Sequence, residues 1–402
     1  MKLRLLFGML CMTQAIVAQQ PETKGKSYFD IVREAYPIPP RVKRLVRKDL
    51  VFPKVGEYQV VTGDFHLHTI FSGGSVLPSE RIYEAYSDGL DVLAITDHAE
   101  YMKTAMPDDT GRAYTQVKDL AASLGLVLIR GAEVSTVYSA ENELMSEVTA
   151  RKNADFIVLF VKDENSLFAP FETAMERARQ QGCLNILAHP GPDWHPMAKK
   201  FLQMGWLHGV EIRNTGAAGG TATDEVDNRF LYPKVANWAR EKGLAMIASS
   251  DAHAATRFER DPNQDRDFTL LLVKDRSPEG VRDAIVSKRT MAWFENVLWG
   301  SEENLSALAA GSLELQEIRM GGVLRGIRIY NKSAFPFEVR FPEGQGAWRM
   351  TRSRITLPAH STTACPASFS SGSAPEVRLR LTNVFVDKDT NLELKKRVAT
   401  GQ

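Results

Sequence analysis

Short apolar runs alternate with helix-periodic segments through the middle of this chain. From Val60 to about residue 273, apolar runs of about five to eight residues, the usual length of buried strands, are each followed by residues with helical periodicity. We expect strands at residues 60–68, 91–97, 126–132, 155–161, 184–188, 208–213, 244–249 and 268–273. Strands and helices that alternate in this way form mostly parallel sheets, so seven or eight units predict an α/β fold, a closed or distorted β/α barrel.

Proline and glycine mark the ends of several expected helices. The pattern predicts helices at Pro78–Ser87, Phe171–Gln181 and Val235–Lys242. Proline opens the first of these, and a glycine follows each of them, at Gly89, Gly182 and Gly243. Glycine commonly ends a helix because it adopts the left-handed backbone conformation without steric cost.

The pattern changes on both sides of the barrel region, which we place at residues 59–305. Beyond it, alternating segments such as PFEVRF and VRLRLTNVFV, separated by Ser, Pro and Gly, predict a small all-β, sandwich-like module at residues 306–402. That segment contains no metal-type cluster of residues, and covering the barrel is favoured over a binding role. Residues 19–58, rich in proline and charge, predict a short N-terminal extension.

The first eighteen residues, MKLRLLFGMLCMTQAIVA, have the pattern of a secretory signal peptide. Lys2 and Arg4 precede an apolar core, and the small residue Ala18 precedes the expected cleavage point. A transmembrane anchor is the alternative, but the apolar run is short and polar residues interrupt it. We expect the mature chain to be secreted without a transmembrane anchor, with the periplasm as its location.

Charge and cysteine content limit the classes of partner. The formal net charge is +1, and loss of Lys2 and Arg4 with the signal leaves −1, so no general attraction to nucleic acid or anionic membrane is expected. The basic stretch at 41–48 is better explained as a solvated helix face than as a polyanion site. Cys183 and Cys365 fall in different predicted domains, and nothing requires them to form a disulfide.

Histidines and acids gather at the ends of the apolar runs. They are His66, His68, His98, Glu133, His189, Asp251 and His253. Residues two apart in a strand point to the same side, so the first two and the last two can present ligands in pairs. Each residue alone could merely satisfy local backbone hydrogen bonds. Repetition over five strand ends, which converge on one face of a parallel barrel, instead predicts a shared metal site.

This mixture of imidazole and carboxylate suits borderline divalent ions such as Zn, Mn or Fe, whereas Ca prefers oxygen ligands alone. A carboxylate can bridge two ions, so Glu133 could be shared between them. Two such ions clamp a phosphoryl group and turn bound water into hydroxide near neutral pH. The expected reaction is therefore metal-assisted hydrolysis.

The segments HLHTIFSGG, AITDHAEY, IRGAEV, LAHPG and SSDAH resemble, in order, the successive motifs of the PHP (polymerase and histidinol phosphatase) superfamily. The flanking phrases GLDVLAITDHAEY, GWLHGVEIRN and FTLLLVKDRS, with a leading signal and a trailing β module, look most like its secreted Sb-PDE-type phosphodiesterase branch. The resemblance spans about residues 55–305 and, more loosely, the rest.

This resemblance implies a distorted (β/α)7 PHP barrel that holds up to three divalent ions. Transferred position by position, the first ion's ligands would be His66, His68, Glu133 and Asp251. Glu133 and His189 would contribute to the second ion, and His98 and His253 to the third. Asp97 would lie behind the ligands and orient a ligand histidine.

Two positions depart from the family pattern. Gly73 replaces the acid of the first motif, which removes a ligand of the third ion. Asp155 stands where the branch usually has a histidine, and it could either ligate the second ion or face water at a strand start. We therefore expect two divalent ions, and a third only weakly held. Asp108 and Asp109 could substitute, although a capping role is favoured for them.

Other polar groups admit two interpretations. Arg266 matches a basic residue of the branch and could bind a phosphate oxygen, and a structural salt bridge is an equal alternative. His195 and His208 could deliver a proton, but packing or surface roles are favoured. Trp194 and Trp206 are expected to pack.

The sequence thus predicts a secreted metal-dependent phosphoesterase that hydrolyses a small-molecule phosphate ester, a diester rather than a monoester. Metal-bound hydroxide would attack, while His98 and His253 shape the site or assist the leaving group. One alternative is a metal-holding binding protein with reduced or lost catalysis, because ligation of the third ion is incomplete. Another is hydrolysis of an amide on the same scaffold, since a metal cluster does not define its substrate. The native metal and the oligomeric state stay open.

Overall fold

The barrel region contains all eight predicted strands in a computed structural model. The structure describes residues 45–101, 112–138, 154–191, 195–215, 233–259, 266–320, 324–343, 348–369 and 376–399. The expected signal peptide, most of the N-terminal extension, Asp108, Asp109 and Trp194 lie outside these ranges. The strands are β1 (Gln59–Asp64), β2 (Val92–Ile95), β3 (Val127–Ser135), β4 (Asp155–Leu159), β5 (Leu184–Leu187), β6 (Gly209–Asn214), β7 (Ala245–Ser249) and β8 (Phe268–Val273).

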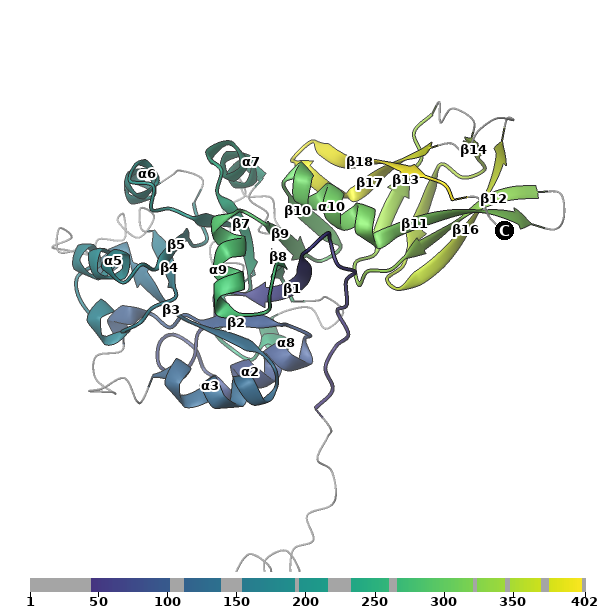
Figure 1. The fold of residues 1–402 in the computed structure, drawn as a ribbon. Coiled ribbons are helices and arrows are strands. Elements are labelled where there is room, and N and C mark those ends of the chain that lie inside the picture. Colours follow the sequence, from purple (N-terminus) through teal and green to yellow (C-terminus); the bar gives the residue numbers. More distant parts are fainter. Residues whose placement is uncertain are drawn as a thin grey trace, which may run out of the picture. The chain divides into compact units, whose positions relative to one another are not determined.

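Helices follow most of these strands and lie around them (Figure 1). They are α2 (Pro78–Ser87), α3 (Ala113–Ser123), α5 (Phe171–Gln180), α6 (Pro196–Gln203), α7 (Pro233–Lys242), α8 (Thr256–Glu259) and α9 (Pro278–Val286), with short 3-10 turns η1 (Ala99–Tyr101), η3 (Thr136–Tyr138) and η4 (Asn165–Leu167). The three helices predicted from the sequence are confirmed to within two residues. The glycines after them all have positive φ, at Gly89, Gly182 and Gly243.

The strand order in this region is β8-β1-β2-β3-β4-β5-β6-β7. Four of the neighbouring pairs are parallel, as the alternating pattern predicted. β4, however, is antiparallel to both β3 and β5, and β8 is antiparallel to β1. The sheet is therefore mixed, with the parallel pairs that were expected and three antiparallel ones that the pattern did not indicate. The hydrophobic pattern of a strand buried on both faces is the same in either direction, so the sequence pattern does not report direction.

The barrel is distorted rather than closed by a continuous ladder. The described strands β7 and β8 form the two ends of this path and do not pair with each other. Threonine side chains bridge the gap instead. Ala248 N donates to Thr269 Oγ1 (3.0 Å), and Thr269 Oγ1 donates back to the Ala248 carbonyl (2.9 Å). Met246 N donates to Thr290 Oγ1 (3.1 Å). These contacts satisfy backbone groups that a closed ladder would otherwise pair.

The C-terminal part is all-β, as predicted, apart from α10 (Glu302–Ser312), within which the expected boundary after residue 305 falls. Two strands, β9 (Thr290–Phe294) and β10 (Val297–Gly300), precede that boundary. The strands after it are β11 (Leu313–Met320), β12 (Leu324–Asn331), β13 (Phe337–Arg340), β14 (Trp348–Met350), β15 (Arg354–Leu357), β16 (Ser361–Phe369), β17 (Glu376–Asp387) and β18 (Thr390–Arg397). One sheet has the order β11-β12-β16-β14. β13, β15 and β18 are connected to the barrel sheet through β17, β10, β9 and β8, so the two parts share one sheet.

Aromatic side chains pack where the barrel meets the C-terminal strands. Trp293 of β9 is buried, and its ring lies 4.8 Å from that of Phe268, 5.3 Å from Phe335 and 5.8 Å from Phe52, all edge-on. Edge-to-face aromatic pairs are favourable beyond the area that they bury. This packing fits the covering role that the sequence favoured for the C-terminal strands.

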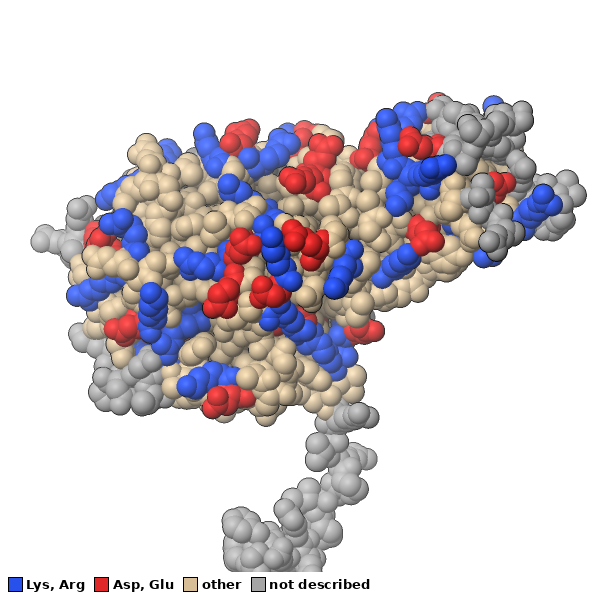
Figure 2. Space-filling view, viewed as in Figure 1, with Lys and Arg blue, Asp and Glu red and all other residues tan. Residues whose placement is uncertain are grey.

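Two further features concern the surface and the cysteines. On the face shown in Figure 2, acidic and basic side chains are interspersed. Among the described residues, no helix is both long and apolar enough to span a membrane. Cys183 and Cys365 are both buried and free of disulfide bonds.

We expect Trp293→Ala to lower the free energy of unfolding by about 3–5 kcal/mol, because it leaves a cavity among three aromatic rings. Trp293→Phe, which retains part of the aromatic contact, should cost less. Urea unfolding followed by tryptophan fluorescence and circular dichroism measures both losses. Equal stability of Trp293→Ala and the unmodified protein would contradict this packing.

Candidate metal centre

The predicted ligands converge on one edge of the barrel sheet, although they come from six strands. His66 and His68 follow β1, His98 follows β2, His189 follows β5, and Asp251 and His253 follow β7, while Glu133 lies within β3 and Asp155 begins β4. Asp155 reaches this edge because β4 is antiparallel, so its first residue pairs with Ser135, the last residue of β3. In a fully parallel barrel, a strand-start acid would lie at the opposite end.

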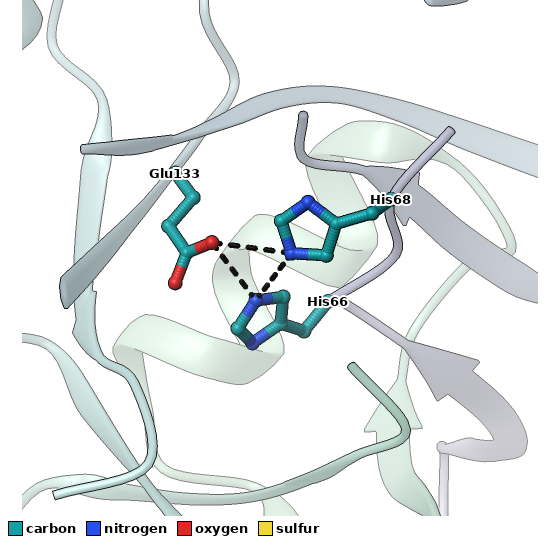
Figure 3. Close-up of side chains that lie close together, drawn as sticks. All are labelled: His66, His68 and Glu133. Atoms are coloured by element: carbon teal, nitrogen blue, oxygen red, sulfur yellow. Dashed lines mark hydrogen bonds and ion pairs between the residues drawn. The ribbon is translucent and has the colours of Figure 1, made fainter. Parts of the chain in front are cut away.

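The first cluster consists of His66, His68, Glu133 and Asp251. Figure 3 shows the two imidazoles and Glu133 pointing at one another. The Nε2 atoms of His66 and His68 are 3.1 Å apart. Glu133 Oε2 lies 3.3 Å from the first of these nitrogens and 3.1 Å from the second. Asp251 Oδ1 lies 3.1 Å from both.

These separations fit a shared cation. Ligand atoms bound about 2.0–2.2 Å from a tetrahedral or six-coordinate ion lie about 3.0–3.5 Å from one another. All four side chains are buried, so water does not hydrate the charge of either carboxylate. Asp251 also has φ +50, an uncommon backbone conformation for a non-glycine residue. Such strain concentrates at functional sites, where surrounding structure holds it in place.

A second cluster shares Glu133 with the first. His189 Nε2 lies 3.3 Å from Glu133 Oε1 and 3.7 Å from Asp155 Oδ2. Glu133 therefore presents one oxygen to each cluster, which is the arrangement of a bridging carboxylate. Asp155 Oδ1 is buried and has no hydrogen-bond partner among the described residues. A buried acceptor of this kind is costly unless something not shown, such as an ion, satisfies it.

Four histidines have an Nδ1 that faces an acceptor, and in three of them, His66, His68 and His98, Nε2 lies within 3.3 Å of Glu133 Oε2. His66 Nδ1 lies 3.0 Å from Glu211 Oε1, His98 Nδ1 lies 3.0 Å from Glu100 Oε1, and His253 Nδ1 lies 2.9 Å from the Asp251 carbonyl. A carboxylate or carbonyl only accepts, so these Nδ1 atoms carry the proton. The neutral tautomer then has its lone pair on Nε2, as metal-binding histidines do.

The fourth histidine is oriented by Asp97 through a serine. Ser72 Oγ donates to Asp97 Oδ1 (2.6 Å), so it must accept from His68 Nδ1 at 3.0 Å. Asp97 also accepts from Thr69 N (2.7 Å) and Thr69 Oγ1 (2.6 Å). Asp97 therefore orients His68 indirectly, through the hydroxyl group of Ser72.

His98 and His253 flank His68 at the border of the first cluster. His68 stacks on His253 with ring centres 4.2 Å apart and lies 5.1 Å from the ring of His98. His98 Nε2 is 3.1 Å from Glu133 Oε2, which already serves the first cluster. A Cβ at Gly73 would lie 3.0 Å from His253 Cδ2 and 3.1 Å from its Nε2. The residue that replaces the family's acid therefore directly faces His253.

The sequence did not identify Glu211 or Asp64 as parts of the site. Glu211 of β6 is fully buried, and its Oε2 accepts from His189 N (2.8 Å) while its Oε1 faces His66. Asp64 accepts from His66 N and from Ser250 N (both 3.2 Å). An acid within a predicted buried strand, such as Glu211 in the strand expected at 208–213, was the available signal.

Arg266 does not reach the centre. Its guanidinium is almost fully buried and lies 2.8 Å from Asp64 Oδ2, with longer contacts to Asp88 and Ser250. This geometry corrects the expectation of a phosphate-binding Arg266 and favours the alternative salt bridge. His195 caps α6, His208 Nδ1 accepts from Asn185 N, and buried Trp206 donates to the Cys183 carbonyl. These residues have packing or capping roles, as expected.

The carboxylates and imidazoles shift one another's pKa values strongly. Burial alone would raise the pKa of Glu133, but His98 and His66 hold it well below its usual range. Burial alone would lower the pKa of His189, but Glu133 and Asp251 raise it to about 10. The pKa of His98 is raised to about 9, since Glu133 and Glu100 outweigh its burial. Without a metal, protons must supply the positive charge that the acids require.

Comparison with known proteins agrees with this geometry. No family model matches the chain. In a solved structure from Bacteroides vulgatus, a two-domain protein containing a predicted PHP-like metal-dependent phosphoesterase superposes with a TM-score of 0.73 at 26% identity and covers 88% of this chain and 99% of that one. The chain has a PHP-like fold. The two-domain arrangement extends the likeness beyond the barrel into the C-terminal strands.

Similarity to curated sequences is confined to about half of this chain. A probable phosphatase of Thermoanaerobacter sp. (strain X514) is 28% identical over 207 residues, which is 48% of this chain and 79% of the relative. A probable phosphatase of Acetivibrio thermocellus is 25% identical over 234 residues, 56% of this chain and 92% of the relative.

We expect the metal-free protein to lose stability as pH rises from about 6.5 toward 10. His98 and His189 have folded-state pKa values of about 9 and about 10, above the unfolded value, so their stabilising contribution is complete below the unfolded pKa and disappears as they deprotonate. Metal ions require deprotonated ligands, so the metal-loaded protein should keep its stability over the same range. Melting temperatures with chelator and with added Mn²⁺ measure the difference. If the melting temperatures of the metal-free and metal-loaded forms fell equally as pH rises, the expectation would be wrong.

Proposed function

We propose that this protein is a secreted metal-dependent phosphoesterase that hydrolyses phosphodiesters with two bound divalent ions of Zn, Mn or Fe. The observation that carries the proposal is the convergence of four Nε2 atoms, those of His66, His68, His98 and His189, on the shared carboxylate Glu133. In the first three of these imidazoles Nδ1 faces an acceptor, so the lone pair on Nε2 points at the buried carboxylate. Lone pairs and anions repel, and only a cation or protons between them make this arrangement stable.

The chain's own residues divide the work between binding and orientation. His66, His68, Glu133 and Asp251 would hold one ion, and Glu133, His189 and Asp155 the other. Two bound divalent ions supply a water of lowered pKa and neutralise charge on the phosphoryl oxygens. Glu211, Ser72 and Asp97 fix the tautomers of the ligands. His98 and His253 border the centre, where they shape the substrate space.

Charge favours a diester over a monoester. The three carboxylates among the ligands offset three of the four positive charges of two divalent ions. Arg81 and Arg266, which contact the metal-bearing segments, are buried and paired with Glu84 and Asp64, so neither is available to a phosphate oxygen. The small remaining positive charge suits the single negative charge of a diester better than the double charge of a monoester. The resemblance to the Sb-PDE-type branch supports the same choice, and the pattern of residues 1–18 supports secretion.

We expect protein reconstituted with Mn²⁺ or Zn²⁺ to hydrolyse bis(4-nitrophenyl) phosphate faster than 4-nitrophenyl phosphate, and the metal-free form to hydrolyse neither. His68→Ala should lower turnover by about 100-fold or more and lose bound metal together, because it removes a ligand of the first ion. Circular dichroism checks that the fold persists. His208→Ala, a histidine of the same region that contacts Asn185, is the matched control and should retain both properties.

Full turnover by His68→Ala would refute the site assignment. Metal binding without turnover on several esters would instead favour a metal-holding binding protein, the alternative that Gly73 suggests. An anilide substrate tested under identical metal loading distinguishes the amide-hydrolysing alternative.

We further propose that two ions bind rather than three, because Gly73 supplies no ligand beside His253. Elemental analysis should find about two equivalents in the unmodified protein and about three in Gly73→Asp. The backbone at Gly73 does not have positive φ, and the side chain of His253 is 42% exposed, so it can move by the few tenths of an ångström that a new Cβ requires. Gly74→Asp is an unsuitable substitute, since its Cβ would lie 2.7 Å from the His68 backbone. Three tightly held ions in the unmodified protein would contradict the proposal.

A further inference from the structure

Arg81, on the buried side of α2, contacts the backbone of both segments that carry the first ion's ligands. Its side chain is fully buried. Nε donates to the His68 carbonyl (2.8 Å), Nη2 to the Ala252 carbonyl (2.6 Å) and Nη1 to the Ala254 carbonyl (2.8 Å). One guanidinium therefore bridges the segment after β1 and the segment after β7.

These two segments otherwise meet through short backbone contacts. His68 N donates to the Ala252 carbonyl (3.1 Å), and Asp251 N donates to the His66 carbonyl (2.9 Å). The ligand side chains on the two segments must keep their separations of 3.1 Å for the first ion to bind. Any sliding of one segment along the other changes all of these distances together.

The charge of Arg81 is balanced within the same helix. Nη1 lies 2.9 Å from Glu84 Oε2, and Glu84 Oε1 accepts from Thr256 N (2.8 Å), the first residue of α8. Glu84 therefore extends the bridge past Ala254, further along the segment after β7. A buried guanidinium is tolerated only when its donors are satisfied, and here three carbonyls and one carboxylate satisfy them.

We propose that Arg81 is a positioning residue that sets the spacing of the first ion's ligands by clamping the two segments together. This inference rests on the proposed metal centre. The planar guanidinium presents donors in several fixed directions, whereas the ammonium of lysine is a single point and cannot reach all three carbonyls at once. His189 and Asp155, the ligands that only the second ion uses, lie on other segments, so the clamp acts directly on the first ion alone.

The test is calorimetric titration of Mn²⁺ into metal-free Arg81→Lys, with the unmodified protein titrated in parallel. We expect affinity for one ion to fall by about 10–100-fold, which is typical when a group behind the ligands is lost, and affinity for the other to stay unchanged. Arg47→Lys is the matched control. Arg47 also donates to backbone carbonyls, those of Gly89 and Leu90, and pairs with Asp91, but it contacts neither ligand segment through these bonds. Both affinities should be unchanged in that variant.

Equal affinities in Arg81→Lys and the unmodified protein would overturn the inference. So would an equal loss for both ions, accompanied by a lower melting temperature of the metal-free variant, because that pattern reports general destabilisation. If Arg81→Lys does not fold, Glu84→Gln carries the test, since it removes the charge partner of Arg81 while leaving the three carbonyl contacts in place. A smaller loss confined to one ion is then expected, and no loss would overturn the inference. If the unmodified protein binds no Mn²⁺ at all, the proposed function fails instead.

Discussion

Burial of negative charge is the constraint on which this centre depends. Glu133 and Asp251 lie in the interior with almost no exposure, where an unpaired carboxylate is strongly unfavourable. Three surrounding imidazoles, those of His66, His68 and His98, have their Nδ1 atoms facing Glu211, Ser72 and Glu100, so they direct lone pairs and not N–H groups at the buried acid Glu133. The local fold is compatible with this arrangement only when protons or divalent ions supply positive charge. Metal binding and stability are therefore linked in the same residues.

The direction of two strands decides which residues take part. Because β4 runs antiparallel, Asp155 joins the edge where β3 and β5 end. Because β8 runs antiparallel to β1, Arg266 precedes β8 beside Asp64, where it neutralises a buried acid under the ligands. Each reversal thus brings a strand-start residue to the ligand edge, a candidate ligand from β4 and, from β8, an arginine that is committed to a buried acid.

Beyond its ligands, the centre is held by groups that touch only backbone or other side chains. Arg81 and Glu84 hold the segments after β1 and β7, Asp97 acts through Ser72, and Glu211 holds both His66 and the His189 backbone. Rigid support of this kind keeps ligand atoms at bonding distance before an ion arrives, so little ordering is needed on binding.

The sequence by itself determined the eight strands, the principal helices, the change to β structure after the barrel and seven of the residues that meet at the centre. It did so because apolar periodicity reports burial, and polar residues at the ends of buried strands have few other reasons to be there. It could not determine that β4 and β8 reverse direction, since a doubly buried strand has the same pattern either way, nor that Arg266 pairs with Asp64. The roles of Ser72, Glu211 and Arg81 also depended on tertiary structure, because hydrogen bonds between residues 13 to 173 positions apart leave no periodic signal in the chain.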